Sequence, residues 1–216
     1  MAKLQKYFLK HLAAAVVVCV MPALASSLHF SAQQLLDWQV KSFHGETQYA
    51  LTNDGDQAVL SADSEASASG LVMETRVDLS ATPYLNWSWN VRQLPATRAD
   101  ESEKDGDDYA ARVYMIFKTG PLFWQSAALN YVWANRRAVG DHWPNAFTNK
   151  VTMLAVDSGA EKTGQWHSYK RNVADDIKRY LGKEVNELKV IAIMTDSDDS
   201  ASRARAYYGD IYFSAE

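Results

Sequence analysis

The sequence predicts an all-β fold, a two-layer β-sandwich of jelly-roll type with one or two short helices. Ten segments carry strand signals, whereas only two short segments carry helical ones. Neither an internal repeat nor a Pro- or Gly-rich linker divides the chain. Seven Trp and eleven Tyr residues give a heavy aromatic load, which suits a β core or a sugar-stacking face. These observations together predict one β domain.

The clearest strand lies between residues 84 and 92, where apolar and polar side chains alternate. Leu85, Trp87, Trp89 and Val91 fall on one face, and polar residues fall on the other. A period of two is typical of a strand with one buried face and one solvated face. We therefore expect Trp87 and Trp89 to lie in the core.

Other segments show the same alternation or a short apolar run bounded by turn residues. The remaining predicted strands are 48–52, 58–62, 71–79, 113–117, 129–133, 151–156, 166–173, 188–194 and 206–213. Apolar residues recur at helical spacing over residues 173–181, with two aspartates in the first turn and Gly182 as a stop. A second short helix is predicted over residues 32–38.

A run of charged residues between Ala99 and Asp108 separates two strong strand signals. Such a short run is typical of a solvated connection within one domain. Asp107 and Asp108 are adjacent, and adjacent side chains on an extended chain point in opposite directions, so they are poorly placed to act together on one substrate. We expect one of them to pair with Arg112 and fix the loop against the sheet.

The N-terminal residues predict a secretory signal followed by one domain. Three lysines precede an apolar stretch over residues 12–20, and Ala23 and Ala25 suit signal peptidase. The apolar stretch is about half the roughly 20 residues that a membrane span needs. Residues 1–25 are therefore predicted to be the signal and residues 26–216 a single exported domain, periplasmic or extracellular. We expect no membrane insertion after cleavage.

The predicted mature chain has a composition that excludes several classes of function. Cys19 is the only cysteine and lies in the predicted signal, so disulfides and thiolate sites are excluded from the mature chain. Removing residues 1–25 removes three lysines and no acidic residue, which changes the formal net charge from −4 to −7. A chain this acidic has no electrostatic basis for binding nucleic acid.

An ordered set of motifs resembles a known bacterial family. The motifs run from Tyr84 to Val91, Gly106 to Tyr114, Tyr131 to Trp133, Arg171 to Val173, Ile191 to Asp198 and Ala206 to Phe213, with Trp166 among them. Together they are similar to the bacterial family known as domain of unknown function 3047. The resemblance spans nearly the whole predicted mature chain and supports its boundaries. It brings no catalytic residues with it.

The last strand motif, from Tyr208 to Phe213, also resembles the final strand of galactose-binding-like jelly rolls. That resemblance implies a structural calcium near this strand. Asp196, Asp198 and Asp210 are the candidate ligands, because carboxylate oxygens suit calcium. The alternative for residues 196–200 is a polar turn, which Asp and Ser also favour.

Some aromatic residues fall where burial is less expected, and they are candidates for a glycan-binding face. The candidates are Trp124, Trp133 and Trp143, with Asn135, Arg136, Asp141 and Asn145 as neighbouring hydrogen-bonding residues. Flat aromatic rings beside hydrogen-bonding side chains would suit a pyranose ring.

The histidines show no metal-binding spacing, and the chain carries no nucleophile elbow or phosphate-binding loop. His142, Tyr131 and Arg136 could form a lyase-like set, but only if the fold brings them together. The sequence thus favours an exported, non-enzymatic domain that binds a glycan or another cell-envelope ligand. The alternatives are a polysaccharide-acting hydrolase or lyase, and a structural or assembly factor of the envelope.

Overall fold

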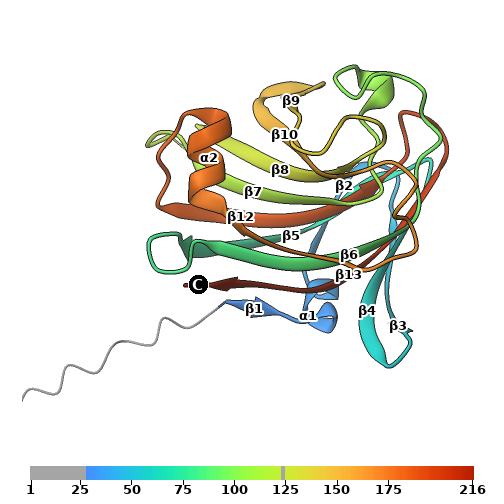
Figure 1. The fold of residues 1–216 in the computed structure, drawn as a ribbon, viewed down its shortest axis with the longest axis horizontal. Coiled ribbons are helices and arrows are strands. Elements are labelled where there is room, and N and C mark those ends of the chain that lie inside the picture. The colour runs from blue at the N-terminus through green and yellow to red at the C-terminus, as the bar shows by residue number, and fades with distance from the viewer. Residues whose placement is uncertain (1–27, 123–124) are drawn as a thin grey trace, which may run out of the picture.

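Two β-sheets packed face to face form the protein, as the computed structural model of the chain shows (Figure 1). The structure describes residues 28–122 and 125–216. The predicted signal with Cys19, and Trp124, lie outside the described residues. The predicted all-β two-layer sandwich is confirmed, and consecutive strands repeatedly cross from one sheet to the other.

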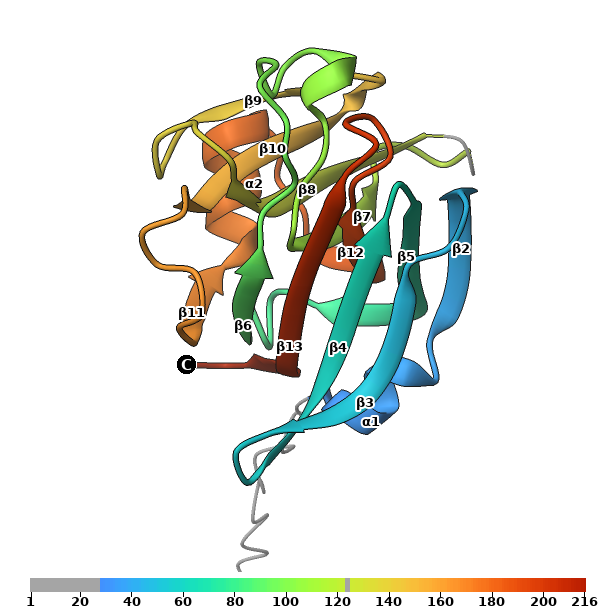
Figure 2. The same cartoon turned by 90° about the vertical axis from the view of Figure 1, so that its right-hand side faces the viewer.

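The first sheet, sheet A, has the strand order β11-β6-β13-β4-β3, with β1 also paired to β13. Its strands are β1 His29–Phe30, β3 Gln48–Asp54, β4 Gln57–Glu65, β6 Tyr84–Gln93, β11 His167–Asn172 and β13 Arg203–Ser214. All its neighbouring strands are antiparallel. Figure 2 shows that the last strand of the chain, β13, runs through the middle of this sheet.

The second sheet, sheet B, has the order β2-β5-β12-β7-β8-β10-β9. Its strands are β2 Gln39–His44, β5 Ala68–Asp78, β7 Arg112–Lys118, β8 Ser126–Ala134, β9 His142–Asn145, β10 Thr148–Ser158 and β12 Glu187–Asp196. Neighbours are antiparallel except β8 and β10, which are parallel.

Two short α-helices complete the fold of the described residues. Helix α1 (Ala32–Leu36) begins with a capping box in which Ser31 and Gln34 bond reciprocally. Helix α2 (Val173–Leu181) is capped by Asn172 and ends at Gly182, whose φ of 64° is left-handed. None of the helices in the described part of the chain has the length and apolarity needed to cross a bilayer.

Aromatic side chains fill the space between the sheets. Trp87 and Trp89 are 2% and 0% exposed, as predicted from the alternation in β6. The Trp87 ring stacks on Tyr131 of sheet B at 5.1 Å and on Tyr169 at 4.9 Å. Offset contacts of this kind add to the free energy of burying large rings, so this aromatic cluster joins the two layers.

Three strands, β1, β2 and β9, were not predicted from the sequence. Every residue of β2 is exposed, because β2 is an edge strand and its side chains need not alternate. Strand β9 contains Pro144, which an edge strand tolerates because one side makes no ladder hydrogen bonds.

The charged run between Ala99 and Asp108, hereafter the acidic loop, is not simply solvated as predicted. Glu101, Asp107 and Asp108 are 2%, 4% and 0% exposed, and a short 3-10 helix (Lys104–Gly106) lies within the loop. The prediction was wrong for these three side chains because each finds hydrogen-bond donors at the end of the sandwich.

Candidate functional site

The buried carboxylates of the acidic loop are satisfied by the protein itself. The Glu101 carboxylate accepts hydrogen bonds from the backbone N–H groups of Asn135, Arg136 and Arg137, at 2.6, 3.2 and 2.9 Å. Three consecutive N–H groups form a concave anion site of the kind that usually holds a ligand. Here Glu101 occupies that site, and it ties the acidic loop to the end of β8.

Arg112 connects the same loop to sheet B. Its guanidinium is ion-paired with Asp196, with Nε to Oδ1 at 2.8 Å, and lies 3.5 Å from an Asp107 carboxylate oxygen. Burial raises the pKa of the Asp107 carboxyl, an effect that the nearby Arg112 opposes. Asp108 points elsewhere and accepts hydrogen bonds from the backbone N–H groups of Asp199 and Ser200. The three buried carboxylates of the acidic loop, Glu101, Asp107 and Asp108, therefore all hold loops in place.

The expectation that Trp133 and Trp143 are exposed is wrong. Trp133 is 0% exposed on the inner face of β8, and its Nε1 donates to the Gly159 carbonyl at 3.0 Å. Trp143 is 4% exposed, lies 6.5 Å from the Tyr109 ring and donates to the Glu101 carbonyl at 2.9 Å. The sequence around Trp143 suggests a loop, but in the structure Trp143 lies in strand β9, which the acidic loop covers.

The polar residues predicted beside those tryptophans also bind protein atoms. Asn135 Nδ2 donates to the Asp108 carbonyl at 2.7 Å, and Asn145 donates to the Asp107 carboxylate. The Arg136 guanidinium donates to two carbonyls of residues 97–98. Asp141 accepts a hydrogen bond from a nearby backbone N–H. The structure thus brings Asn135, Arg136 and Asn145 together around the acidic loop rather than around an open sugar platform, whereas Asp141 bonds within its own turn.

The predicted calcium ligands are not brought together. Asp196 is committed to Arg112, whereas Asp210 lies in sheet A, 3.0 Å from His29 Nε2. That set does not fit one ion. Carboxylate oxygens of Asp108, Asp198 and Asp199 do lie within 4.8 Å of one another and could hold a divalent cation. Burial and the neighbouring carboxylates raise the pKa of Asp199 to about 6.

The lyase-like set is not assembled either. The Tyr131 hydroxyl donates to Asp176 at 2.5 Å within the core, and the Arg136 guanidinium donates to the carbonyls of residues 97 and 98. His142 packs against Tyr180, with ring centroids 5.1 Å apart. No shared space joins these three side chains, so geometry gives them no common acid–base role.

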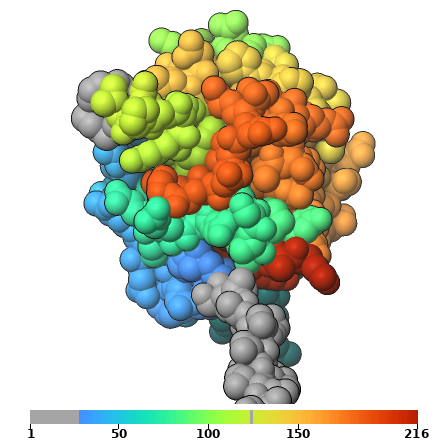
Figure 3. All heavy atoms as spheres, turned by 90° about the vertical axis from the view of Figure 1, so that its left-hand side faces the viewer, coloured from blue at the N-terminus to red at the C-terminus, as the bar shows by residue number. Residues whose placement is uncertain are grey.

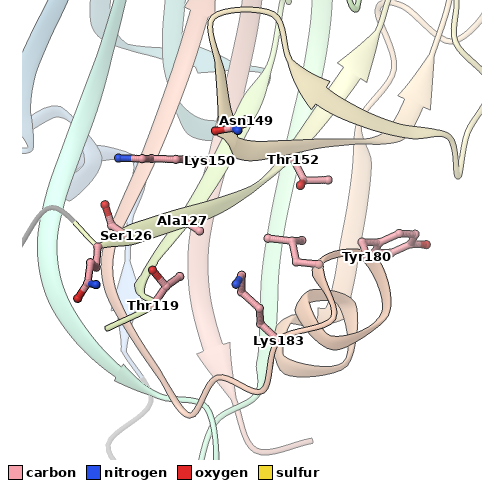
Figure 4. Close-up of a pocket in the computed structure, with 10 residues that line it drawn as sticks. Thr119, Ser126, Ala127, Asn149, Lys150, Thr152, Tyr180 and Lys183 are labelled. Atoms are coloured by element: carbon pink, nitrogen blue, oxygen red, sulfur yellow. The ribbon is translucent and has the colours of Figure 1, made fainter. Parts of the chain in front are cut away.

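A pocket of about 570 Å³ opens between α2 and the ends of β8 and β10 (Figure 4). We call it the end pocket. Its lining residues are Thr119, Gln125, Ser126, Ala127, Asn149, Lys150, Thr152, Tyr180, Leu181 and Lys183. In Figure 4 the strand residues form one wall, and Tyr180 and Lys183 rise from the opposite wall. The same end of the molecule faces the viewer in Figure 3, where α2 (orange) lies beside the β7–β8 region (yellow-green).

Local sequence explains how the end pocket stays open. Ala127 is small and forms part of the floor. Gly182 ends α2 in a left-handed conformation, which turns the chain so that Lys183 follows at the rim. The Gln125 side chain accepts a hydrogen bond from the Leu122 N–H at 3.0 Å, which braces the β7–β8 turn beside the pocket.

Polar side chains dominate the end pocket, and most have no protein partner. Within residues 28–122 and 125–216, no protein group hydrogen-bonds to the side chains of Thr119, Ser126, Asn149, Thr152, Lys150 or Lys183 that line it. No Asp or Glu is among the described lining residues, so the two lysines make the end pocket positive in an acidic protein. Nothing in the local sequence marks these residues, which come from three separate segments.

A family model matches residues 36–212 and carries the description protein of unknown function (DUF3047). The chain belongs to this family. The match confirms the family resemblance of the sequence motifs. None of the curated protein sequences matches this DUF3047 chain.

Several solved structures share the outline of this DUF3047 fold. A family 30 carbohydrate-binding module of a Clostridium thermocellum cellulase is 14% identical, with a TM-score of 0.48 over 83% of this chain and 91% of that one. A Bacillus licheniformis family 12 xyloglucanase is 10% identical, with a TM-score of 0.45 over 87% and 95%. The xyloglucanase domain of a Sinorhizobium fredii type three effector is 12% identical, with a TM-score of 0.44 over 89% and 99%.

Proposed function

We propose that this DUF3047 protein is an exported glycan-binding protein and that the end pocket is its binding site. One observation carries the proposal: six polar side chains that have no hydrogen-bond partner among the described residues surround a space of about 570 Å³. A sugar is recognised by many hydrogen bonds to its hydroxyls, and small-molecule sites occupy about 300–1,000 Å³. Hydroxyl, amide and ammonium groups supply the donors and acceptors that such a ligand needs.

The charge of the end pocket favours a glycan with acidic groups. Lys150 and Lys183 have no carboxylate partner in the part of the chain that the structure describes, whereas Lys178 of α2 is paired with Glu184 at 3.0 Å. A uronate carboxylate, or another anionic sugar substituent, would supply the missing counter-charge. We therefore propose that acidic oligosaccharides bind more tightly than neutral ones.

The same lining argues for binding rather than hydrolysis. Glycoside hydrolysis ordinarily requires two Asp or Glu side chains that flank the scissile bond. No such pair lies among the described residues of the end pocket. The buried carboxylates elsewhere are engaged with Arg112, Arg171, His167 or backbone N–H groups. Retention of the glycan is the role that the lining supports.

Export is part of the proposal and is supported by the N-terminal sequence. Lysines, a short apolar stretch and two small residues stand in the order that signal peptidase substrates share. A glycan ligand outside the cytoplasm agrees with that destination.

The test is calorimetric titration of the purified protein with oligogalacturonates, alginate oligomers and neutral oligosaccharides of matched length. Acidic oligomers should bind, and added salt should weaken their binding. Lys150→Gln and Lys183→Gln should each weaken binding about two- to fivefold, the usual range for one exposed charge pair. Lys178→Gln is the matched control, because Lys178 is exposed on α2 but already paired and outside the pocket.

The outcomes separate the candidate functions. An equal loss of affinity in Lys178→Gln and Lys183→Gln would mean that the glycan binds outside the end pocket. Shortening of the polysaccharide during incubation would establish a hydrolase or lyase, and no binding to any oligosaccharide would leave the envelope structural role.

A further inference from the structure

A second hollow, separate from the end pocket, lies on the outer face of sheet A. It measures about 340 Å³ and spans strands β11, β6, β13 and β4, which stand side by side in Figure 2. None of its lining residues belongs to the end pocket.

Small residues form the floor of this hollow. Ser88 of β6 is directly opposite Ser168 of β11, and the pairing between β6 and β13 shifts between Tyr208 and Ile211. Gly209 lies in that bulge, and a Cβ built on it would come 2.3 Å from Ser88 Oγ. A side chain at position 209 would require the Ser88 hydroxyl to move, so glycine leaves the space beside Ser88 free.

A cross-strand row forms one wall. Lys170, Asn86 and Tyr212 lie opposite one another on β11, β6 and β13. The Tyr212 side chain is 39% exposed, which is high for a large aromatic residue, and its ring is supported by His29 at 5.6 Å. Its ring thus offers a flat apolar surface at the edge of a polar hollow, which is the arrangement that stacks on the C–H face of a sugar.

A positive charge, a negative charge and several uncharged polar groups face this hollow. Asp210 is fixed by His29 Nε2 at 3.0 Å and by the Ala32 N–H at 3.2 Å, yet its side chain remains 43% exposed. The Lys170 ammonium lies 5.0 Å from the Tyr84 ring. In the described part of the chain, the side chains of Gln57, Ser88 and Ser168 form no hydrogen bond with the protein. Acceptors and donors are therefore both available, with one positive and one negative charge.

We propose that this hollow is a second carbohydrate-binding site, which takes a neutral hexose residue. A hexose both donates and accepts through its hydroxyls, so it can use Asp210 as an acceptor and the Lys170 and Gln57 groups as donors. An anionic ligand would be repelled by Asp210, and the absence of net charge distinguishes the hollow from the positive end pocket. The volume of about 340 Å³ is at the lower end of small-molecule sites, as one sugar residue requires. This inference does not depend on the end pocket binding anything.

The experiment is NMR titration of the ¹⁵N-labelled purified protein with neutral tetrasaccharides of glucose, mannose and galactose, and with tetragalacturonate. At least one neutral probe should shift the amides of Ser88, Ser168 and Gly209 while leaving those of Ser126 and Thr152 unchanged. Tetragalacturonate should not shift the amides of the sheet A hollow. Neutral probes that shift only end-pocket amides, or no amides, overturn the proposal.

Matched substitutions identify the aromatic wall. Tyr212→Ala should weaken binding of the neutral probe about five- to tenfold, the effect of losing one aromatic contact. Tyr207→Ala is the control, because Tyr207 lies in the same strand but does not line the hollow. Equal weakening in both variants, or none in Tyr212→Ala, refutes the assignment, and far-UV circular dichroism verifies that both variants fold.

Discussion

Glu101→Ala is the substitution whose effect follows most directly from the structure. The Glu101 side chain is 2% exposed and its carboxylate is the shared acceptor for three backbone N–H groups, at 2.6, 3.2 and 2.9 Å. Removing it leaves three donors at the end of β8 without that acceptor. It also detaches the acidic loop from residues 135–137, although the Glu101 carbonyl can still accept from Trp143.

The expected size comes from the hydrogen bonds that are lost. A hydrogen bond to a charged group contributes about 1.5–3 kcal/mol. Three such bonds on one carboxylate are not additive, and water can reach the partly buried donors once the side chain is gone. We therefore expect a loss of about 3 kcal/mol in the free energy of unfolding. With a urea slope of about 2 kcal/mol per M, the unfolding midpoint should fall by about 1.5 M.

Urea unfolding followed by tryptophan fluorescence measures this loss. Glu103→Ala is the matched control, since Glu103 is in the same loop, is exposed and makes no side-chain cap. Its free energy of unfolding should change by less than about 0.5 kcal/mol. If Glu101→Ala and Glu103→Ala have the same midpoint, the acidic loop is not held by its buried carboxylate and the reasoning fails.

Two further substitutions probe other polar groups. Asp199 has a pKa raised to about 6, so its charged form is disfavoured in the folded state and its contribution to stability falls as pH rises from about 4 to 6. Asp199→Asn should therefore raise the melting temperature at pH 7 and leave it unchanged near pH 3, whereas a lower melting temperature at pH 7 would show that the charge is compensated, for example by a bound cation. Tyr131→Phe removes the 2.5 Å bond to Asp176, which Arg171 still holds, and should cost about 1–2 kcal/mol, or about 3–6 °C in melting temperature. An unchanged melt would mean that this hydroxyl adds no net stability.

Strand alternation was a reliable guide wherever one face of a strand is buried. The pattern around Trp87 and Trp89 placed both rings in the core, because a shift of one residue would expose the whole apolar set. The same reasoning could not find β2, whose six residues are all exposed. Nor could it find β9, where Pro144 suggests a loop unless the strand is known to be at an edge.

The surroundings of Trp143 were not predictable from neighbouring residues. Its burial depends on the acidic loop, which lies more than thirty positions earlier and folds over it because Glu101 meets three N–H groups. A charged run normally indicates solvent exposure, and only tertiary contacts reverse that expectation. Asp210 and Asp196 were likewise grouped by residue type, although they belong to different sheets.

The end pocket illustrates a different limit. Its residues come from segments around positions 119–127, 149–152 and 180–183, and none forms a motif with its neighbours. What identifies the pocket is that its polar side chains have no hydrogen-bond partner among the described residues. That property depends on the folded structure and cannot be read from the sequence.

The position of β13 has a consequence for biogenesis. Residues 203–214 lie between β6 and β4, so the two halves of sheet A have no common partner until this strand is available. During vectorial synthesis the edges of β6 and β4 that pair with β13 stay unsatisfied until residues 203–214 have been made. Sheet A can therefore reach its native arrangement only after this strand has been synthesised, however early its other strands are made.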